Sequence, residues 1–187
     1  MLYLGRLALK KGLEYLVEAA TELDGPYELV DDGDGERRDG LEALADRLGV
    51  SVIFKRFVDP DDIGAYYQGA DVFVLPSIEG EGIPSAVLEA MAWGLPVIGT
   101  DSGGVGETLR DGDPGYLVLM RDSSALADAV QELLDDGERR REMGRAARRY
   151  ASEHHSWESL TEFLEEIYAS RPAASRRILA SKVKREG

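Results

Sequence analysis

Residues 71–89 read DVFVLPSIEGEGIPSAVLE, and this stretch decides the fold class. Residues 72–75 form an apolar run without alternation, as expected for a central parallel strand that is covered on both faces. A loop with two glycines and two carboxylates follows. The chain then passes Pro84 into an apolar-periodic stretch, which is typical of a helix start. This order of strand, loop and helix is one unit of an α/β protein.

Strands and helices alternate on both sides of this unit. We predict strands at residues 2–4, 27–30, 52–57, 72–75, 96–100 and 116–119. We predict helices at about 11–23 and 36–48, from 59–62 onward, after 84, after 104, and at 123–134, 138–150 and 156–168. Right-handed crossovers between such units give a single doubly wound parallel sheet of about six strands, with helices on both faces and extra helices at the C-terminus. We expect one Rossmann-like domain over residues 1–170 and a basic, flexible tail at 171–187.

The composition excludes several classes of function. The chain has 187 residues and a net charge of −14, which disfavours nucleic-acid phosphates as partners and loose adhesion to anionic lipid. One local basic patch could still touch a membrane peripherally. The absence of cysteine excludes disulfides and thiolate chemistry. Because no apolar run is long enough to span a membrane and the N-terminus resembles no signal peptide, we expect a cytoplasmic protein without a transmembrane segment.

The carboxyl edge of the predicted sheet is the expected binding site, since doubly wound sheets bind ligands there at the topological switch point. Free N–H groups at a helix start attract anions such as phosphate, and carboxylates such as Glu81 and Glu89 accept hydrogen bonds from hydroxyls. A ligand with a central diphosphate and hydroxyl-rich rings, such as a nucleotide sugar, would use both. Glu79 is a rival for the first acidic position, and an ordinary acidic helix start is the alternative interpretation of the pair.

Two further loops carry candidate binding residues. Arg6 follows Gly5 after the first strand, and Lys11 lies five residues on. An arginine can fork onto phosphate oxygens and a lysine supplies a mobile charge, although a solvated basic helix start is the alternative. Gly103 and Gly104 follow the fifth strand, where they would either admit a ligand or form a tight turn.

Two other motifs are weaker. Residues 33–35 (GDG) lack the third glycine of the dinucleotide fingerprint, so a turn is the better interpretation. His154 and His155 are the only histidines, they are adjacent in the sequence, and no carboxylate cluster with metal spacing accompanies them. We therefore predict a solvated helix end there, with no metal site and no Ser–His–Asp arrangement.

The ordered set of motifs resembles the C-terminal, donor-binding domain of GT-B-fold retaining glycosyltransferases of family 4 (glycosyl transferases group 1). The resemblance covers about residues 2–170, which would form one half of a GT-B enzyme. The segments that carry it are 4–7 (LGRL) with 11–12 (KG), 33–35 (GDG), 70–76 (ADVFVLP), 81–92 (EGIPSAVLEAMA, an E-x7-E motif), 94–97 (GLPV), 101–107 (DSGGVGE, a D-x-G-G-x-x-E loop) and 156–157 (SW).

The resemblance implies roles for individual residues. Arg6 and Lys11 would hold the donor diphosphate, Glu81 would bind hydroxyls of the transferred sugar, and Glu89 would bind the ribose hydroxyls. Cofactors and metals are not implied, since the nucleoside-diphosphate sugar is itself the donor substrate. The remaining residues implied in donor binding are Gly82, Ile83, Pro84, Gly5, Gly103 and Gly104.

The chain departs from the family pattern in three places. We expect the family's N-terminal, acceptor-binding domain to be absent from this chain. Arg56 stands where the family often has glycine, near the expected base-binding loop. Asp31 and Asp32 replace the apolar residues usual at the end of the second strand.

The resulting prediction is a donor-binding domain whose parent enzyme transfers a hexose from a nucleoside-diphosphate sugar to a hydroxyl acceptor (saccharide, lipid or other) with retention. Alone, the domain is expected to be weak or inactive. The alternatives are a nucleotide-sugar epimerase on the same fold and a non-catalytic nucleotide-sugar-binding module. A plain dinucleotide-binding domain is disfavoured by the missing G-x-G-x-x-G.

Overall fold

The computed structural model describes residues 1–24, 28–32, 35–55, 59, 61–80, 82, 84–110, 114–156, 159 and 161. It divides into two compact units, Met1–Ala151 and Ser152–Gly187, and the sheet lies in the first unit. The helix predicted at 156–168 falls almost wholly outside the described residues, and the predicted tail at 171–187 falls entirely outside them.

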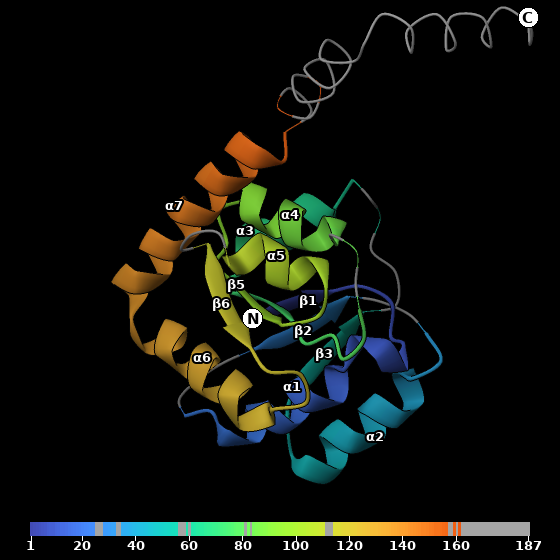
Figure 1. Ribbon diagram of the computed structural model, residues 1–187. Coiled ribbons are helices and arrows are strands. Elements are labelled where there is room, and N and C mark those ends of the chain that lie inside the picture. The colour runs from blue at the N-terminus through green and yellow to red at the C-terminus, as the bar shows by residue number, and fades with distance from the viewer. Residues whose placement is uncertain are drawn as a thin grey trace, which may run out of the picture. The chain divides into compact units, whose positions relative to one another are not determined.

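A six-stranded parallel sheet forms the centre of the first unit, with the strand order β3-β2-β1-β4-β5-β6 (Figure 1). This order confirms the predicted doubly wound sheet. The order reverses between β1 and β4, which pair through Leu2 and Phe73, so the switch point lies there. The strands are β1 (Leu2–Leu4), β2 (Leu29–Asp32), β3 (Val52–Lys55), β4 (Phe73–Leu75), β5 (Val97–Thr100) and β6 (Gly115–Val118).

Helices cover both faces of the sheet. α1 (Leu13–Ala19) packs against both α2 (Arg38–Leu48) and α6 (Ser123–Asp135) on one face. The helices α3 (Ile63–Gly69), α4 (Ser85–Ala92) and α5 (Gly104–Arg110) lie together on the other face (Figure 1). Two short 3-10 turns, η1 (Leu9–Lys11) and η2 (Ala20–Glu22), flank α1, and α7 (Gly137–His154) follows α6.

The core explains the apolar run at residues 72–75. β4 lies between β1 and β5, and Phe73, Val74 and Leu75 are all fully buried. A strand in the middle of a parallel sheet has helices on both faces, so every one of its side chains must be apolar. All four residues of β5 are buried as well, and all but Thr100 are apolar.

The structure corrects three predicted boundaries. β2 continues through Asp32 instead of ending at Val30, because Asp32 pairs with Leu4 on one side and with Lys55 on the other. Pairing with two neighbouring strands here outweighs the low strand propensity of aspartate. The helix predicted at 11–23 is instead split into η1, α1 and η2, since Gly12 takes a left-handed conformation between η1 and α1. The third helix begins at Ile63, later than the acidic residues at 59–62 suggested.

Candidate functional site at the carboxyl edge of the sheet

The loop after β1 is held by a buried tyrosine at its start. The hydroxyl of Tyr3 donates a hydrogen bond to the carbonyl of Arg6 at 3.1 Å, and the Tyr3 side chain is completely buried. The side chain of Arg6 is exposed and that of Lys11 is partly exposed. The sheet core thus fixes the backbone of this loop, while its two candidate cations face toward solvent.

Gly12 brings the loop after β1 into direct contact with the loop after β4. A β-carbon at Gly12 would lie 2.2 Å from the carbonyl oxygen of Pro76, and the residue has a φ of 63°. The amide of Ile78 also donates to the carbonyl of Lys10 at 2.9 Å. The basic loop and the loop that leads to the E-x7-E motif therefore lie side by side at the switch point.

The loop after β2 joins the same edge through Gly35. A β-carbon there would lie 2.3 Å from the carbonyl oxygen of Leu7, and the amide of Arg37 donates to that carbonyl at 3.1 Å. The loop after β5 joins through Thr100, whose buried hydroxyl donates to the carbonyl of Ser77. These contacts confirm that the loops after β1, β2, β4 and β5 gather at one edge.

α4 begins directly beside this edge. Pro84 takes an extended conformation and caps the helix, so the first helical residue is Ser85, one position later than a proline at the first helical position implies. Val87, Ala90 and Met91 face the core, whereas Glu89 in the second turn is exposed. The hydroxyl of Tyr67 in α3 donates to Oε2 of Glu89 at 2.9 Å.

Of the predicted site residues, the structure places Gly5, Arg6 and Lys11 in one loop, which touches the loop after β4. Pro84 and Glu89 belong to the start of α4, and Gly82 is exposed just before it. Gly103 has a φ of 62° and immediately precedes Gly104, the first residue of α5. Glu81 and Ile83 lie outside the described residues.

Three residues that build this edge were not found from the sequence: Tyr67, Thr100 and Arg38. Arg38 is buried, and its guanidinium donates to the carbonyls of Lys55 at 2.9 Å and Phe54 at 3.1 Å. It also pairs with Glu42 at 2.8 Å. Arg38 thus holds the carboxyl end of β3 against α2. Its sequence context, an arginine in a polar helix, gave no signal of burial.

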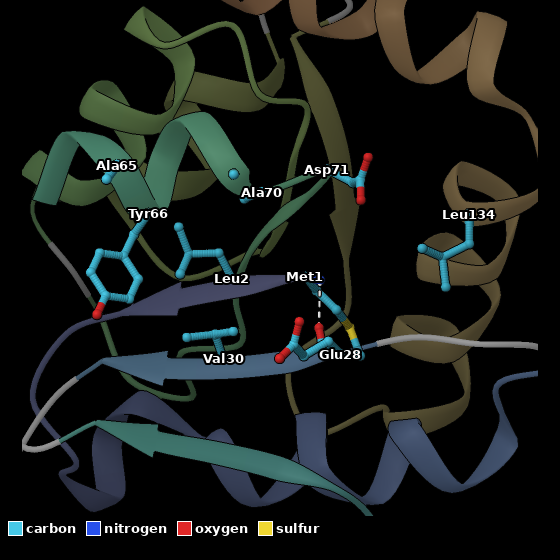
Figure 2. Close-up of a pocket in the computed structure, with 10 residues that line it drawn as sticks. Met1, Leu2, Glu28, Val30, Ala65, Tyr66, Ala70, Asp71 and Leu134 are labelled. Carbon is cyan, nitrogen blue, oxygen red and sulfur yellow. Dashed lines mark hydrogen bonds between the residues drawn. The ribbon is translucent and has the colours of Figure 1, made fainter.

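The pocket drawn in Figure 2 is lined mainly at the amino ends of the strands, with Ala65 and Tyr66 of α3 lining it farther along, and it contains none of the predicted site residues. It encloses about 510 Å³ at the amino ends of β1, β2 and β4. The Met1 amino group donates to the carbonyl of Glu28 at 2.8 Å there. Burial lowers the pKa of this amino group, and Asp71 and Glu28 raise it in part. The residues that line the pocket are Met1, Leu2, Glu28, Val30, Ala65, Tyr66, Gly69, Ala70, Asp71 and Leu134.

Neither a metal site nor a membrane-spanning helix occurs in the part of the chain that the structure describes. There, no three His, Cys, Asp or Glu side chains are grouped as they would be around a metal ion. Within the same residues, no helix combines the length and apolar character needed to cross a bilayer.

The two histidines lie at the end of α7. This helix ends at His154, and the pKa of His155 is lowered by burial first and then by its neighbour His154.

Known proteins are similar to this chain along most of its length. It is 37% identical over 182 residues to a D-inositol 3-phosphate glycosyltransferase of Corynebacterium urealyticum, covering 91% of this chain and 42% of that protein. It is 34% identical over 184 residues to a GDP-mannose-dependent alpha-(1-6)-phosphatidylinositol monomannoside mannosyltransferase of Mycolicibacterium smegmatis, covering 91% of this chain and 48% of that protein. The chain therefore spans somewhat less than half the length of these relatives.

A solved structure supports the same fold. The Anabaena protein HepE, crystallised in complex with UDP, superposes with a TM-score of 0.83 at 24% identity, covering 91% of this chain and 48% of that one. The family model described as "Glycosyl transferases group 1" matches residues 1–150, which contain the whole sheet and each of the loops at its carboxyl edge. On this match the chain belongs to the group 1 family of glycosyl transferases.

Proposed function

We propose that this chain is the donor-binding part of a retaining glycosyltransferase, and that the whole enzyme transfers a hexose from a nucleoside-diphosphate sugar to a hydroxyl acceptor. The observation that carries the proposal is the contact between the loops after β1 and β4. Lys10 and Ile78 join these loops, so the basic segment lies beside the loop that leads to α4, at the switch point. Ligands of doubly wound sheets bind at this place.

The charges at this edge suit the two ends and the middle of such a donor. Arg6 and Lys11 supply positive charge on one side, and the N-terminus of α4 supplies unpaired N–H groups and a positive dipole end on the other. Together they would bind the diphosphate and stabilise the charge that develops on it as it leaves. Glu89 would accept hydrogen bonds from the ribose hydroxyls, and Glu81 from those of the transferred sugar.

The relatives narrow the class of donor. The mycobacterial relative is named for its dependence on GDP-mannose, and the corynebacterial relative for glycosyl transfer to an inositol phosphate. The mycobacterial name specifies a nucleotide-linked hexose as donor, and the corynebacterial name specifies an acceptor that carries hydroxyls. Both are in keeping with the proposed reaction. Because the chain covers 42% and 48% of these proteins, we assign acceptor binding to the remainder of the enzyme, and expect this chain alone to bind donor with little or no turnover.

Isothermal titration calorimetry of the folded chain against UDP, GDP and ADP, and against their glucose or mannose conjugates, tests the proposal. At least one nucleoside diphosphate should bind, and Arg6→Met should weaken it about tenfold because one diphosphate contact is lost. Arg47→Met is the matched control, since Arg47 is an exposed arginine in the last turn of α2 and so lies away from this edge. A folded sample that binds no nucleotide of the panel contradicts the proposal.

A further inference from the structure

We propose that Tyr67 is a positioning residue that holds the Glu89 carboxylate ready to accept the hydroxyls of a ribose. The inference rests on the proposed function, because it assumes that Glu89 meets the ribose of the donor. It adds a residue outside the recognised motifs, on a different helix, that would determine how strongly the nucleoside part of the ligand binds.

The hydrogen bond from Tyr67 to Glu89 is the central observation. The hydroxyl of Tyr67 lies 2.9 Å from Oε2 of Glu89 and 3.4 Å from the carbonyl of Ala86. A phenol has one proton to donate, and the shorter contact to a charged acceptor is the stronger one. The carboxylate is thus bonded from the protein side through one oxygen. Its two oxygens together have about four lone-pair sites, so acceptor capacity remains for a pair of ligand hydroxyls.

Tyr67 is itself rigidly placed. Its side chain is 1% exposed, and its ring packs against that of Phe73 in β4, with a centroid distance of 6.2 Å and an interplanar angle of 42°. α3 also packs against the end of α4, since a β-carbon at Gly64 would lie 3.0 Å from the ring of Trp93. The phenol therefore reaches Glu89 from a helix that is fixed to both the sheet and α4.

Tyr67 is buried and Glu89 is exposed, and this difference indicates what the hydrogen bond between them does. Glu89 is exposed, and an exposed glutamate has several rotatable bonds and samples many rotamers. A bond from a buried donor restricts those rotamers during folding, before any ligand arrives. Ligand binding then loses less side-chain entropy, which is the general advantage of preorganised contacts.

Tyr67→Phe removes only the hydroxyl and keeps the ring in the core, so it isolates this contact. Using the full chain, affinities are measured by calorimetry for the nucleoside diphosphate that binds wild type best and for inorganic pyrophosphate, which has no ribose. We expect roughly three- to tenfold weaker binding of the nucleotide and unchanged binding of pyrophosphate. Tyr116→Phe is the matched control, because the Tyr116 hydroxyl also donates to a glutamate, Glu132 in α6, but Tyr116 lies in β6 at the far side of the sheet from the switch point.

A double-mutant cycle separates positioning from a general effect on structure. In a Glu89→Ala background, Tyr67→Phe should have no further effect on nucleotide affinity, since no carboxylate is left to hold. The inference is overturned if Tyr67→Phe leaves nucleotide affinity unchanged, if it weakens nucleotide and pyrophosphate equally, or if its effect persists without Glu89. Those three outcomes leave the proposed function standing, provided that Glu89→Ala alone weakens nucleotide binding. Absence of nucleotide binding by folded wild type overturns both proposals.

Discussion

The amide of Ile78 and the carbonyl of Lys10 are joined by a hydrogen bond of 2.9 Å, which links the loop after β1 to the loop after β4. These loops belong to the two strands at which the order of the sheet reverses. The bond uses only backbone atoms, so its presence depends on the path of both loops and not on the side chains at these positions. The absence of a side chain at Gly12 is consequently more important for this contact than the identity of the exposed side chains around it.

Gly12→Ala should disrupt this contact. The new β-carbon would lie 2.2 Å from the carbonyl oxygen of Pro76, at a residue whose φ is 63°. We expect the free energy of unfolding to fall by about 3 kcal/mol, from left-handed strain and overpacking together. Gly49→Ala is the control, because Gly49 has a φ of 71° but its added methyl group would meet no atom within 4 Å, so about 1 kcal/mol should be lost. Urea unfolding measures both, and equal losses would contradict the role given to the loop contact.

Gly35→Ala and Gly40→Ala should have effects of opposite sign. A β-carbon at Gly35 would lie 2.3 Å from the carbonyl oxygen of Leu7, so the loop must shift, at a cost of about 1–3 kcal/mol. Gly40 lies inside α2 with open space around it, and alanine there should stabilise the chain by about 0.5–1 kcal/mol. Thermal unfolding of the two variants beside wild type checks the signs. If Gly35→Ala raised the stability of the chain, the loop after β2 could not be held against Leu7 as described.

Arg38→Met should loosen the end of β3. The variant keeps most of the aliphatic stem but removes the donors to the carbonyls of Phe54 and Lys55. We expect a loss of about 2–3 kcal/mol, since hydrogen bonds from charged donors are strong and two of them are removed. Arg37→Met, one residue earlier and exposed, should change the free energy of unfolding by less than about 0.5 kcal/mol. Similar denaturation midpoints for the two variants would be inconsistent with Arg38 holding the end of β3 against α2.

Thr100→Val should weaken the junction between β5 and the loop after β4. The buried hydroxyl of Thr100 donates to the carbonyl of Ser77, and valine removes it at nearly constant volume. Removing the donor to this buried carbonyl costs about 1–3 kcal/mol. Thr100→Ser keeps the donor and loses one methyl group, about 1 kcal/mol. Chemical unfolding, together with nucleotide titration, distinguishes them: the valine variant should lose more affinity, and the reverse order would contradict this role.

The apolar pattern was sufficient to predict the sheet. β4 and β5 are buried on both faces, so their residues are apolar except for Thr100 at the end of β5, and no register had to be known. The end of β2 was predicted wrongly, because Asp31 and Asp32 have low strand propensity and their pairing partners are distant in sequence. The split at Gly12 was missed for a similar reason: the glycine is required by Pro76, more than 60 residues away.

The candidate site was predictable only in its local parts. Residues within one strand–loop–helix unit, such as Pro84 and Glu89, could be placed from their spacing. Tyr67 could not, because its partner Glu89 lies on another helix and its apolar neighbours suggest only a core position. The roles of Arg6, Lys11 and Glu89 in ligand binding stay predictions, as do those of Glu81 and Ile83.

The pairing of β1 with β4 also bears on how the chain folds. β1, β2 and β3 are consecutive in the chain, as are β4, β5 and β6, so each three-stranded half can form from nearby segments. The seam between the halves joins Leu2 to Phe73 and demands the longest loop closure in the sheet. A nucleotide that spans this seam would bind only the completed sheet. Its binding should therefore slow hydrogen exchange at the seam more than within either half, and so report on the last step of assembly.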